Sequence, residues 1–179
     1  MGNSIIQGWG QADPEFFSNT KFINRGIGGQ TTSQMLARFE RDVIDIRPQA
    51  VLILAGTNDI AGNTGEVTLE QIRDNIAEMA KMATDNDIQV ILCSVLPAFD
   101  YPWRRGRRPD QKIPELNVLL KELADQEKLY YLDYFSEMSD HRNGLPVELA
   151  EDGVHPTHKG YALMKDLTLN ALKEWKLLP

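Results

Sequence analysis

Short apolar runs alternate along this chain with longer stretches of helical periodicity, and this alternation constrains the fold more than any other feature. Three runs stand out, AVLILA at 50–55, IQVILCSV at 88–95 and LYYLDYF at 129–135, with a weaker one, KFINRGI, at 21–27. The runs at 50–55 and 88–95 are almost continuous in Val, Ile and Leu, which is typical of strands buried on both faces of a parallel sheet.

Amphipathic helices are predicted between these runs and after the last of them. The four stretches with a helical period are SQMLARFERDVIDI, TLEQIRDNIAEMAKMA, IPELNVLLKELADQ and HKGYALMKDLTLNALKEW. Pro48 ends the first stretch, and Thr68 and Gln71 open the second with the spacing of a capping box. Strands and helices in this alternation form right-handed βαβ crossovers, so we expect an α/β fold with helices on both faces of the sheet. No linker or repeat interrupts the pattern, and residues 1–179 are expected to form one domain.

The composition excludes several classes of protein. The net charge of -7 disfavours a general nucleic-acid binder, because a polyanion would be repelled at long range. No apolar run approaches the roughly 20 residues of a membrane-spanning helix. The single cysteine, Cys93, allows no internal disulfide, and its apolar neighbours predict a small buried hydrophobic residue. No targeting segment is visible, which leaves the compartment open: cytoplasmic by default, or exported if an upstream segment was removed.

The loops that follow the carboxyl ends of the strands are where a ligand is expected. In parallel α/β sheets, ligands bind outside this edge, where loops leave for the helices. The loops that this rule selects are GNSIIQG, GIGGQTT, AGTND, SVLPAFDYPWRRGRRP and the stretch that ends in DGVHP. Their polar residues are therefore the candidates for chemistry.

A hydroxyl and an imidazole–carboxylate pair are the first candidates. Ser4 follows a small glycine in GNS, as a nucleophile on a tight turn would, although the G-x-S-x-G elbow of α/β-hydrolases is not present. Asp152 and His155 are three residues apart, so the carboxylate can hold the imidazole tautomer and leave the other nitrogen as a base. The alternative is a metal site of Asp152, His155 and His158, which the lack of an H-E-x-x-H motif disfavours. His141 is predicted to be an exposed loop residue.

Two further loops carry groups that can donate hydrogen bonds to an oxyanion. In GIGGQTT, the backbone N–H of Gly28 or Gly29 can be aimed at an anion, because glycine lets a ligand approach the main chain. The alternative is a plain turn before a helix that Thr31 or Thr32 caps. Asn58, at the end of a predicted strand, can donate its side-chain amide or make an Asx turn. A hydroxyl, a base with its acid and two oxyanion donors are the parts that acyl transfer needs.

The four blocks GNS, GIGGQTT, GTND and DGVHP, in this order, resemble those of the SGNH (GDSL-like) hydrolase family over nearly the whole chain. The resemblance implies a three-layer α/β/α domain with a parallel, flavodoxin-like sheet. It also implies a serine esterase or acylhydrolase that needs no metal and no organic cofactor. The GIGGQTT block looks most like the branch that includes platelet-activating-factor acetylhydrolase subunits.

The resemblance also assigns roles to residues of this chain. Ser4 is implied as the nucleophile, His155 as the base and Asp152 as its partner. The oxyanion hole is implied to combine the N–H of Ser4 with the N–H of Gly29 and the side chain of Asn58. Gly28 is the next choice for the glycine, since the register of GIGGQTT allows a shift by one residue.

The first block departs from the family's pattern in two ways. Asn3 stands where the family usually has Asp, which preserves the shape and loses the charge. Three residues precede Ser4, whereas the family's central first strand runs into this block. We therefore expect a truncated first strand that continues upstream in the true protein. If residues 1–179 are complete, we expect Ser4 to be poorly fixed and the activity to be low.

The loop LPAFDYPWRRGRRPDQK gives the most information about the substrate. Tyr101 and Trp103 are predicted to stack on a sugar ring, and Arg105 with its neighbouring arginines to bind an acidic group. Asn3 is a further candidate contact. The alternative is a solvated loop whose positive charges balance an acidic protein.

The predicted reaction is removal of a short acyl group, acetyl above all, from a small-molecule or carbohydrate ester, because no long hydrophobic segment offers room for a fatty chain. The alternatives are a lysophospholipase or thioesterase, and a catalytically weak, sugar-binding SGNH module. The sequence leaves open whether the protein is a homodimer and whether Trp175 packs on this domain or on a partner.

Overall fold

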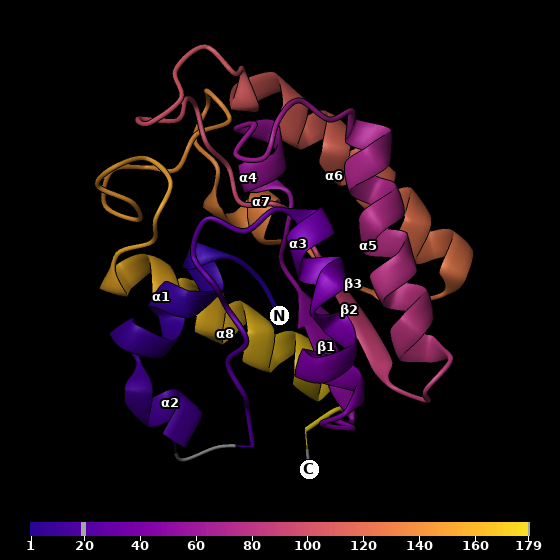
Figure 1. The fold of residues 1–179 in the computed structure, drawn as a ribbon. Coiled ribbons are helices and arrows are strands. Elements are labelled where there is room, and N and C mark those ends of the chain that lie inside the picture. Colours follow the sequence, from indigo (N-terminus) through magenta and orange to yellow (C-terminus); the bar gives the residue numbers. More distant parts are fainter. Residues whose placement is uncertain (19–20, 179) are drawn as a thin grey trace.

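The computed structural model of the protein describes residues 1–18 and 21–178 (Figure 1). The elements in chain order are α1 (Ser4–Ala12), α2 (Pro14–Ser18), α3 (Thr32–Ala37), the π-helical turn η1 (Glu40–Ile44), β1 (Ala50–Ile53), α4 (Thr57–Ile60), α5 (Leu69–Thr84), β2 (Gln89–Cys93), α6 (Pro109–Glu127), β3 (Tyr130–Leu132), α7 (Tyr134–Met138) and α8 (His158–Glu174). Within the described ranges, every helix is too short or too polar to cross a bilayer.

The sheet has three parallel strands in the order β1-β2-β3. Isolated parallel bridges join Gly2 to Leu54, just beyond β1, and to Gly26 on the other side. The backbone order is therefore Gly26, Gly2, β1, β2, β3, which is the 2-1-3-4-5 order of a flavodoxin-like sheet. The predicted strand at 21–27 is reduced to the bridge at Gly26. A Cβ there would lie 2.1 Å from the Gln7 nitrogen, so a glycine is needed where this segment crosses α1.

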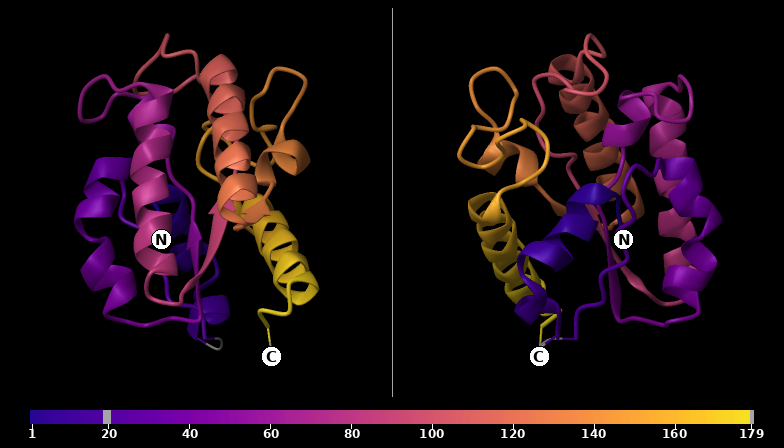
Figure 2. Two further views of the ribbon diagram at one scale, coloured as in Figure 1. Left: turned by 90° about the vertical axis from the view of Figure 1, so that its right-hand side faces the viewer. Right: turned by 60° about the vertical axis from the view of Figure 1, so that its left-hand side comes forward.

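Helices cover both faces of the sheet, and Figure 2 shows α1 and α8 on one side and α3 and α5 on the other. Successive residues of β2 point to opposite faces, as the pleat requires. Val90 and Leu92 join the core cluster beneath α3, α5 and α6, whereas Ile91 and Cys93 join the cluster beneath α1, α7 and α8. The three-layer α/β/α architecture predicted from the sequence is confirmed.

Several local predictions can be compared with the observed elements. Thr68 and Gln71 form the predicted capping box, and Thr31 is the cap of α3. Cys93 is 1% exposed, as expected. The run at 129–135 was expected to be one strand, but β3 ends at Leu132 because the Asp133 carboxylate accepts the Ser136 N–H at 3.1 Å and begins α7.

Helices α1, α2, α4 and α7 were missed in the sequence, since each is short. Trp175 packs on this domain: its ring stacks on Tyr130, with the ring centroids 4.7 Å apart.

Candidate active site

Ser4 is the first residue of α1, and the chain before it is held on both sides. The Leu54 N–H donates to the Met1 carbonyl at 3.2 Å, and the Ile27 N–H donates to the Gly2 carbonyl at 3.1 Å. These bonds continue the sheet up to the serine. The expectation of a poorly fixed Ser4 is therefore not met, because the first two residues already occupy the central strand position.

Three side chains from the two ends of the chain meet at this edge of the sheet. The Ser4 hydroxyl oxygen lies 3.0 Å from His155 Nε2, although the two residues are 151 positions apart. His155 Nδ1 lies 2.6 Å from Asp152 Oδ2. The structure thus brings Ser4, His155 and Asp152 into one continuous hydrogen-bonded chain.

The loop before α8 holds the Asp152 carboxylate in place. Its Oδ1 accepts the N–H groups of Val154 at 2.9 Å and His155 at 2.7 Å. Gly153 between them has φ +78°, a left-handed conformation that favours glycine. Burial raises the pKa of Asp152, but the hydrogen bonds from the His155 ring, the His155 N–H and the Val154 N–H outweigh it. The pKa lies below its usual value, so the carboxylate is ionised at neutral pH.

The glycine loop (GIGGQTT, residues 26–32) lies next to Ser4, and the N–H groups of Gly28 and Gly29 differ in their hydrogen bonds. A Cβ at Gly28 would be 3.8 Å from the Ser4 Cβ, which places this loop beside the hydroxyl. The Gly28 N–H donates to Gln7 Oε1 at 2.6 Å. The Gly29 N–H has no acceptor within hydrogen-bond distance in residues 1–18 and 21–178. Of the two, Gly29 is therefore the one with a free donor.

Asn58 lies in the short helix α4, which follows β1 directly. The carboxyl end of β1 turns through Gly56, whose φ is +122°. The Asn58 side chain is 3% exposed, and its Nδ2 donates to the Gln30 carbonyl at 3.0 Å. This bond uses one of the two amide hydrogens and ties Asn58 to the glycine loop.

Two of the predicted substrate contacts are wrong, because both side chains are buried. Tyr101 is 0% exposed, and its hydroxyl lies 2.8 Å from Thr57 Oγ1, so its ring has no face for a sugar. Asn3 is 1% exposed, and its Oδ1 accepts the Ile5 N–H at 3.0 Å as the N-cap of α1. Asn is a favoured cap residue, which accounts for this use of its side chain.

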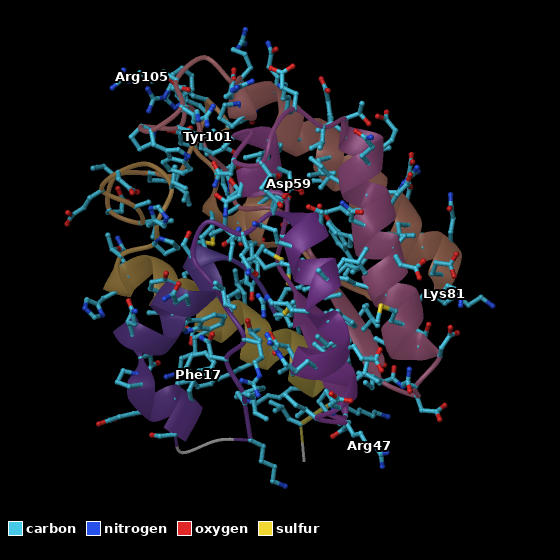
Figure 3. All side chains as sticks on the ribbon, viewed as in Figure 1. Phe17, Arg47, Asp59, Lys81, Tyr101 and Arg105 are labelled. Carbon is cyan, nitrogen blue, oxygen red and sulfur yellow. The ribbon has the colours of Figure 1, made fainter. Side chains whose placement is uncertain are left out.

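Trp103 is an aromatic residue of the long loop that faces solvent beside His155. Its side chain is 42% exposed, and its ring centroid lies 5.9 Å from that of His155. The buried ring of Tyr101 stacks beneath it at 5.1 Å. Arg105 extends from the outer end of the loop, beyond Tyr101 in Figure 3. It is exposed and has no ion-pair partner in the part of the chain that the structure describes.

The remaining histidines lie apart from this chain of hydrogen bonds. His158 begins α8 and lines a shallow cavity of about 270 Å³ with Asp13 and Lys165. His141 is exposed, as predicted. Among the described residues, no three His, Cys, Asp or Glu side chains are grouped so that they could hold a metal ion.

Sequence reasoning missed the residues that support the glycine loop. Gln7 holds the Gly28 N–H, and the Asn63 side chain donates to the Gly29 carbonyl at 3.0 Å. Asp59 accepts the Thr32 N–H at 2.9 and 3.0 Å and the Thr32 hydroxyl at 2.6 Å. None of these contacts has a local spacing signal, since each joins segments that are far apart in the sequence.

The chain belongs to the GDSL-like lipase/acylhydrolase family, whose model matches residues 1–163. The description of the family names lipases and acylhydrolases, which are hydrolases that act on esters. In structure, the chain is similar to a GDSL-like lipase from Bacteroides thetaiotaomicron, with 43% identity, a TM-score of 0.94 and coverage of 97% of this chain and 86% of the other.

Two curated relatives are more distant. Platelet-activating factor acetylhydrolase IB subunit alpha1 of Homo sapiens is 30% identical over 142 residues, which are 74% of this chain. The uncharacterized lipoprotein YqeF of Bacillus subtilis is 34% identical over 85 residues, which are 46% of this chain. The matched segments span 56% of the human subunit and 35% of YqeF.

Proposed function

We propose that this protein is a serine esterase that removes a short acyl group, acetyl above all, from a carbohydrate ester. The observation that carries the proposal is the hydrogen-bonded chain from the Ser4 hydroxyl through His155 to Asp152, with distances of 3.0 and 2.6 Å. This order of hydroxyl, imidazole and carboxylate is what a serine nucleophile needs for its activation.

In the first half of the proposed reaction, Ser4 Oγ attacks the carbonyl carbon of the ester and passes its proton to His155 Nε2. The Asp152 carboxylate holds Nδ1–H and stabilises the imidazolium that forms. The carbon–oxygen bond to the alcohol then breaks, and the alcohol leaves with the proton from His155. In the second half, water gives its proton to His155 and attacks the acyl–Ser4 ester, which releases the acid and restores Ser4.

The proposed oxyanion donors are the N–H groups of Ser4 and Gly29 and the side-chain amide of Asn58. The Ser4 N–H is among the first N–H groups of α1, which have no acceptor inside the helix. Among the described residues, the Gly29 N–H has no acceptor, and the Asn58 side chain uses one of its two amide hydrogens. Each such donor contributes roughly 10²–10³ to kcat in acyl-transfer enzymes.

Two observations support the proposed substrate. The half-exposed Trp103 ring beside His155 offers a flat apolar face, on which a sugar ring in the alcohol part of the ester can stack. The human relative is named an acetylhydrolase, which supports a short acyl group.

The test is hydrolysis of p-nitrophenyl acetate by the wild type and by Ser4→Ala, each with and without EDTA. We expect Ser4→Ala to lower kcat by roughly 10⁴-fold or more and EDTA to change nothing. Ser18→Ala is the matched control, since Ser18 is an exposed serine at the end of α2. Equal activity of wild type and Ser4→Ala would refute the proposal.

A panel of p-nitrophenyl esters from acetate to laurate, with acetylated xylo-oligosaccharides beside it, tests the substrate. We expect kcat/KM to be highest for acetate and to fall with chain length. A maximum at eight or more carbons would instead indicate a lipase or lysophospholipase. Binding of the sugar with no hydrolysis would indicate a binding module.

A further inference from the structure

The segment that follows β1 holds the glycine loop through three side chains. Asn58 donates to the Gln30 carbonyl, Asn63 donates to the Gly29 carbonyl, and Asp59 accepts from Thr32. Asn58 is a proposed oxyanion donor, and Asp59 lies beneath the start of α3. Asn63 has no place in the proposed reaction, although its amide is bonded to the residue whose N–H is left free.

We propose that Asn63 is a positioning residue. Its bond to the Gly29 carbonyl fixes the peptide between Gly29 and Gln30, which limits rotation at Gly29 and keeps the Gly29 N–H, in the preceding peptide, directed at the developing oxyanion. This inference rests on the proposed function. The contact that carries it is the bond of 3.0 Å from Asn63 Nδ2 to the Gly29 carbonyl.

Gly29 depends on hydrogen bonds for its position because, within residues 1–18 and 21–178, nothing packs against the side where a side chain would stand. Gly28 and Gly29 are both exposed, and no heavy atom lies within 4 Å of the position that a Cβ would take at Gly29. With φ +75° and no side chain, Gly29 has more backbone freedom than any other residue type would have. Without a bond at its carbonyl, this residue is free to turn and to re-aim its N–H.

One backbone group on each side of Gly29 already has its own support. Gln7 accepts the Gly28 N–H at 2.6 Å, and Asn58 donates to the Gln30 carbonyl at 3.0 Å. Asn63 supports the peptide between these two groups, because it donates to the Gly29 carbonyl. Asn63 is itself held, because its own N–H donates to the Asn58 carbonyl at 3.0 Å. The same short segment therefore sets both proposed oxyanion donors relative to each other.

The variant that tests this is Asn63→Leu, which keeps a similar shape and donates no hydrogen bond. The matched control is Asn86→Leu. Like Asn63, Asn86 makes a solvent-exposed hydrogen bond to a backbone carbonyl: its Nδ2 donates to the Met82 carbonyl at 2.9 Å. Asn86 follows the end of α5, and Lys81, in the last turn of that helix, lies far from Asp59 and Tyr101 in Figure 3.

The measurements are kcat and KM for p-nitrophenyl acetate, and the inhibition constant of a trifluoromethyl ketone. This ketone adds Ser4 Oγ to its carbonyl carbon and so presents a tetrahedral oxyanion to the same donors. For Asn63→Leu we expect kcat to fall about 3- to 10-fold, which corresponds to the net value of one hydrogen bond. KM should stay within about twofold, and the inhibition constant should rise by the same factor as kcat falls. Asn86→Leu should match the wild type in all three.

A purely structural role would give a different pattern. A fraction of permanently inactive protein lowers the measured kcat but leaves the inhibition constant unchanged, because that constant is measured on the active molecules alone. Reversible unfolding raises KM and the inhibition constant together and leaves kcat unchanged, because ligands bind only the folded state. Wild-type kcat and inhibition constant in Asn63→Leu would overturn the inference, and so would a change in KM alone. If Asn63→Leu does not fold, Asn63→Ala carries the same test.

The failure of the inference can be told apart from that of the proposed function. If Ser4→Ala abolishes activity while Asn63→Leu behaves as the wild type, the inference alone is wrong. If Ser4→Ala keeps its activity, both are wrong.

Discussion

Replacing Asp59 with asparagine should change how the stability of this protein depends on pH. Asp59 is 5% exposed, and its carboxylate accepts the N–H and the hydroxyl of Thr32. Burial raises its pKa from 3.8 to about 6, and the hydrogen bonds from Thr32 oppose this only in part. The amide side chain that Asp59→Asn introduces fills nearly the same volume and carries no titrating proton.

The direction and the size of this change in stability follow from the pKa of Asp59 in the folded protein and in the unfolded chain. Between pH 3.8 and pH 6 the folded protein keeps the proton that the unfolded chain has lost, so stability falls as pH rises through this window. The difference of 2.2 pH units, 6 minus 3.8, corresponds to about 3 kcal/mol at 1.36 kcal/mol per unit. Well above pH 6 the wild type has lost all of this stability, whereas Asp59→Asn loses none of it because its side chain does not titrate.

Urea unfolding of both proteins at pH 4, 5, 6, 7 and 8 measures this directly. The free energy of unfolding of Asp59→Asn, relative to that of the wild type, should rise by about 2 kcal/mol from pH 4 to pH 7 and then level off, because part of the full effect is already present at pH 4. All other titrating groups are shared and cancel in the difference. A difference that stays constant with pH would refute the reasoning, since it would mean that Asp59 titrates alike in the folded and unfolded states.

Two further substitutions test the substrate face and the buried ion pair between Arg38, at the end of α3, and Asp42 in η1. Trp103→Ala should raise KM for an acetylated sugar about 2- to 10-fold and leave KM for a small aliphatic acetate unchanged, as steady-state kinetics on both esters will show. Arg38→Met should lower the free energy of unfolding by about 1–3 kcal/mol in urea at pH 7, because it removes the guanidinium 2.6 Å from the buried Asp42 carboxylate and leaves Arg41 as the remaining partner. Arg41→Met, which removes the exposed partner of the same carboxylate, is the control and should change stability little.

The sequence by itself determined the two central strands β1 and β2, the edge of the sheet that carries the candidate site, and one pair of its side chains. Short, almost continuous runs of Val, Ile and Leu are typical of buried strands, and parallel strands place their carboxyl-terminal loops together. Asp152 and His155 could be paired because three residues of chain and a glycine turn bring them into contact locally.

The tertiary structure alone decided the contacts between distant segments. The Ser4–His155 distance depends on how α1 and the loop before α8 dock on the same sheet edge, which no local spacing encodes. Tyr101 and Trp103 are both aromatic residues of one loop and look alike in the sequence. Tyr101 is buried and bonded to Thr57, whereas Trp103 faces solvent. The role of Asn63 could not be predicted from the sequence for the same reason. Its hydrogen bond to a backbone carbonyl 34 residues away requires no particular pattern in the chain.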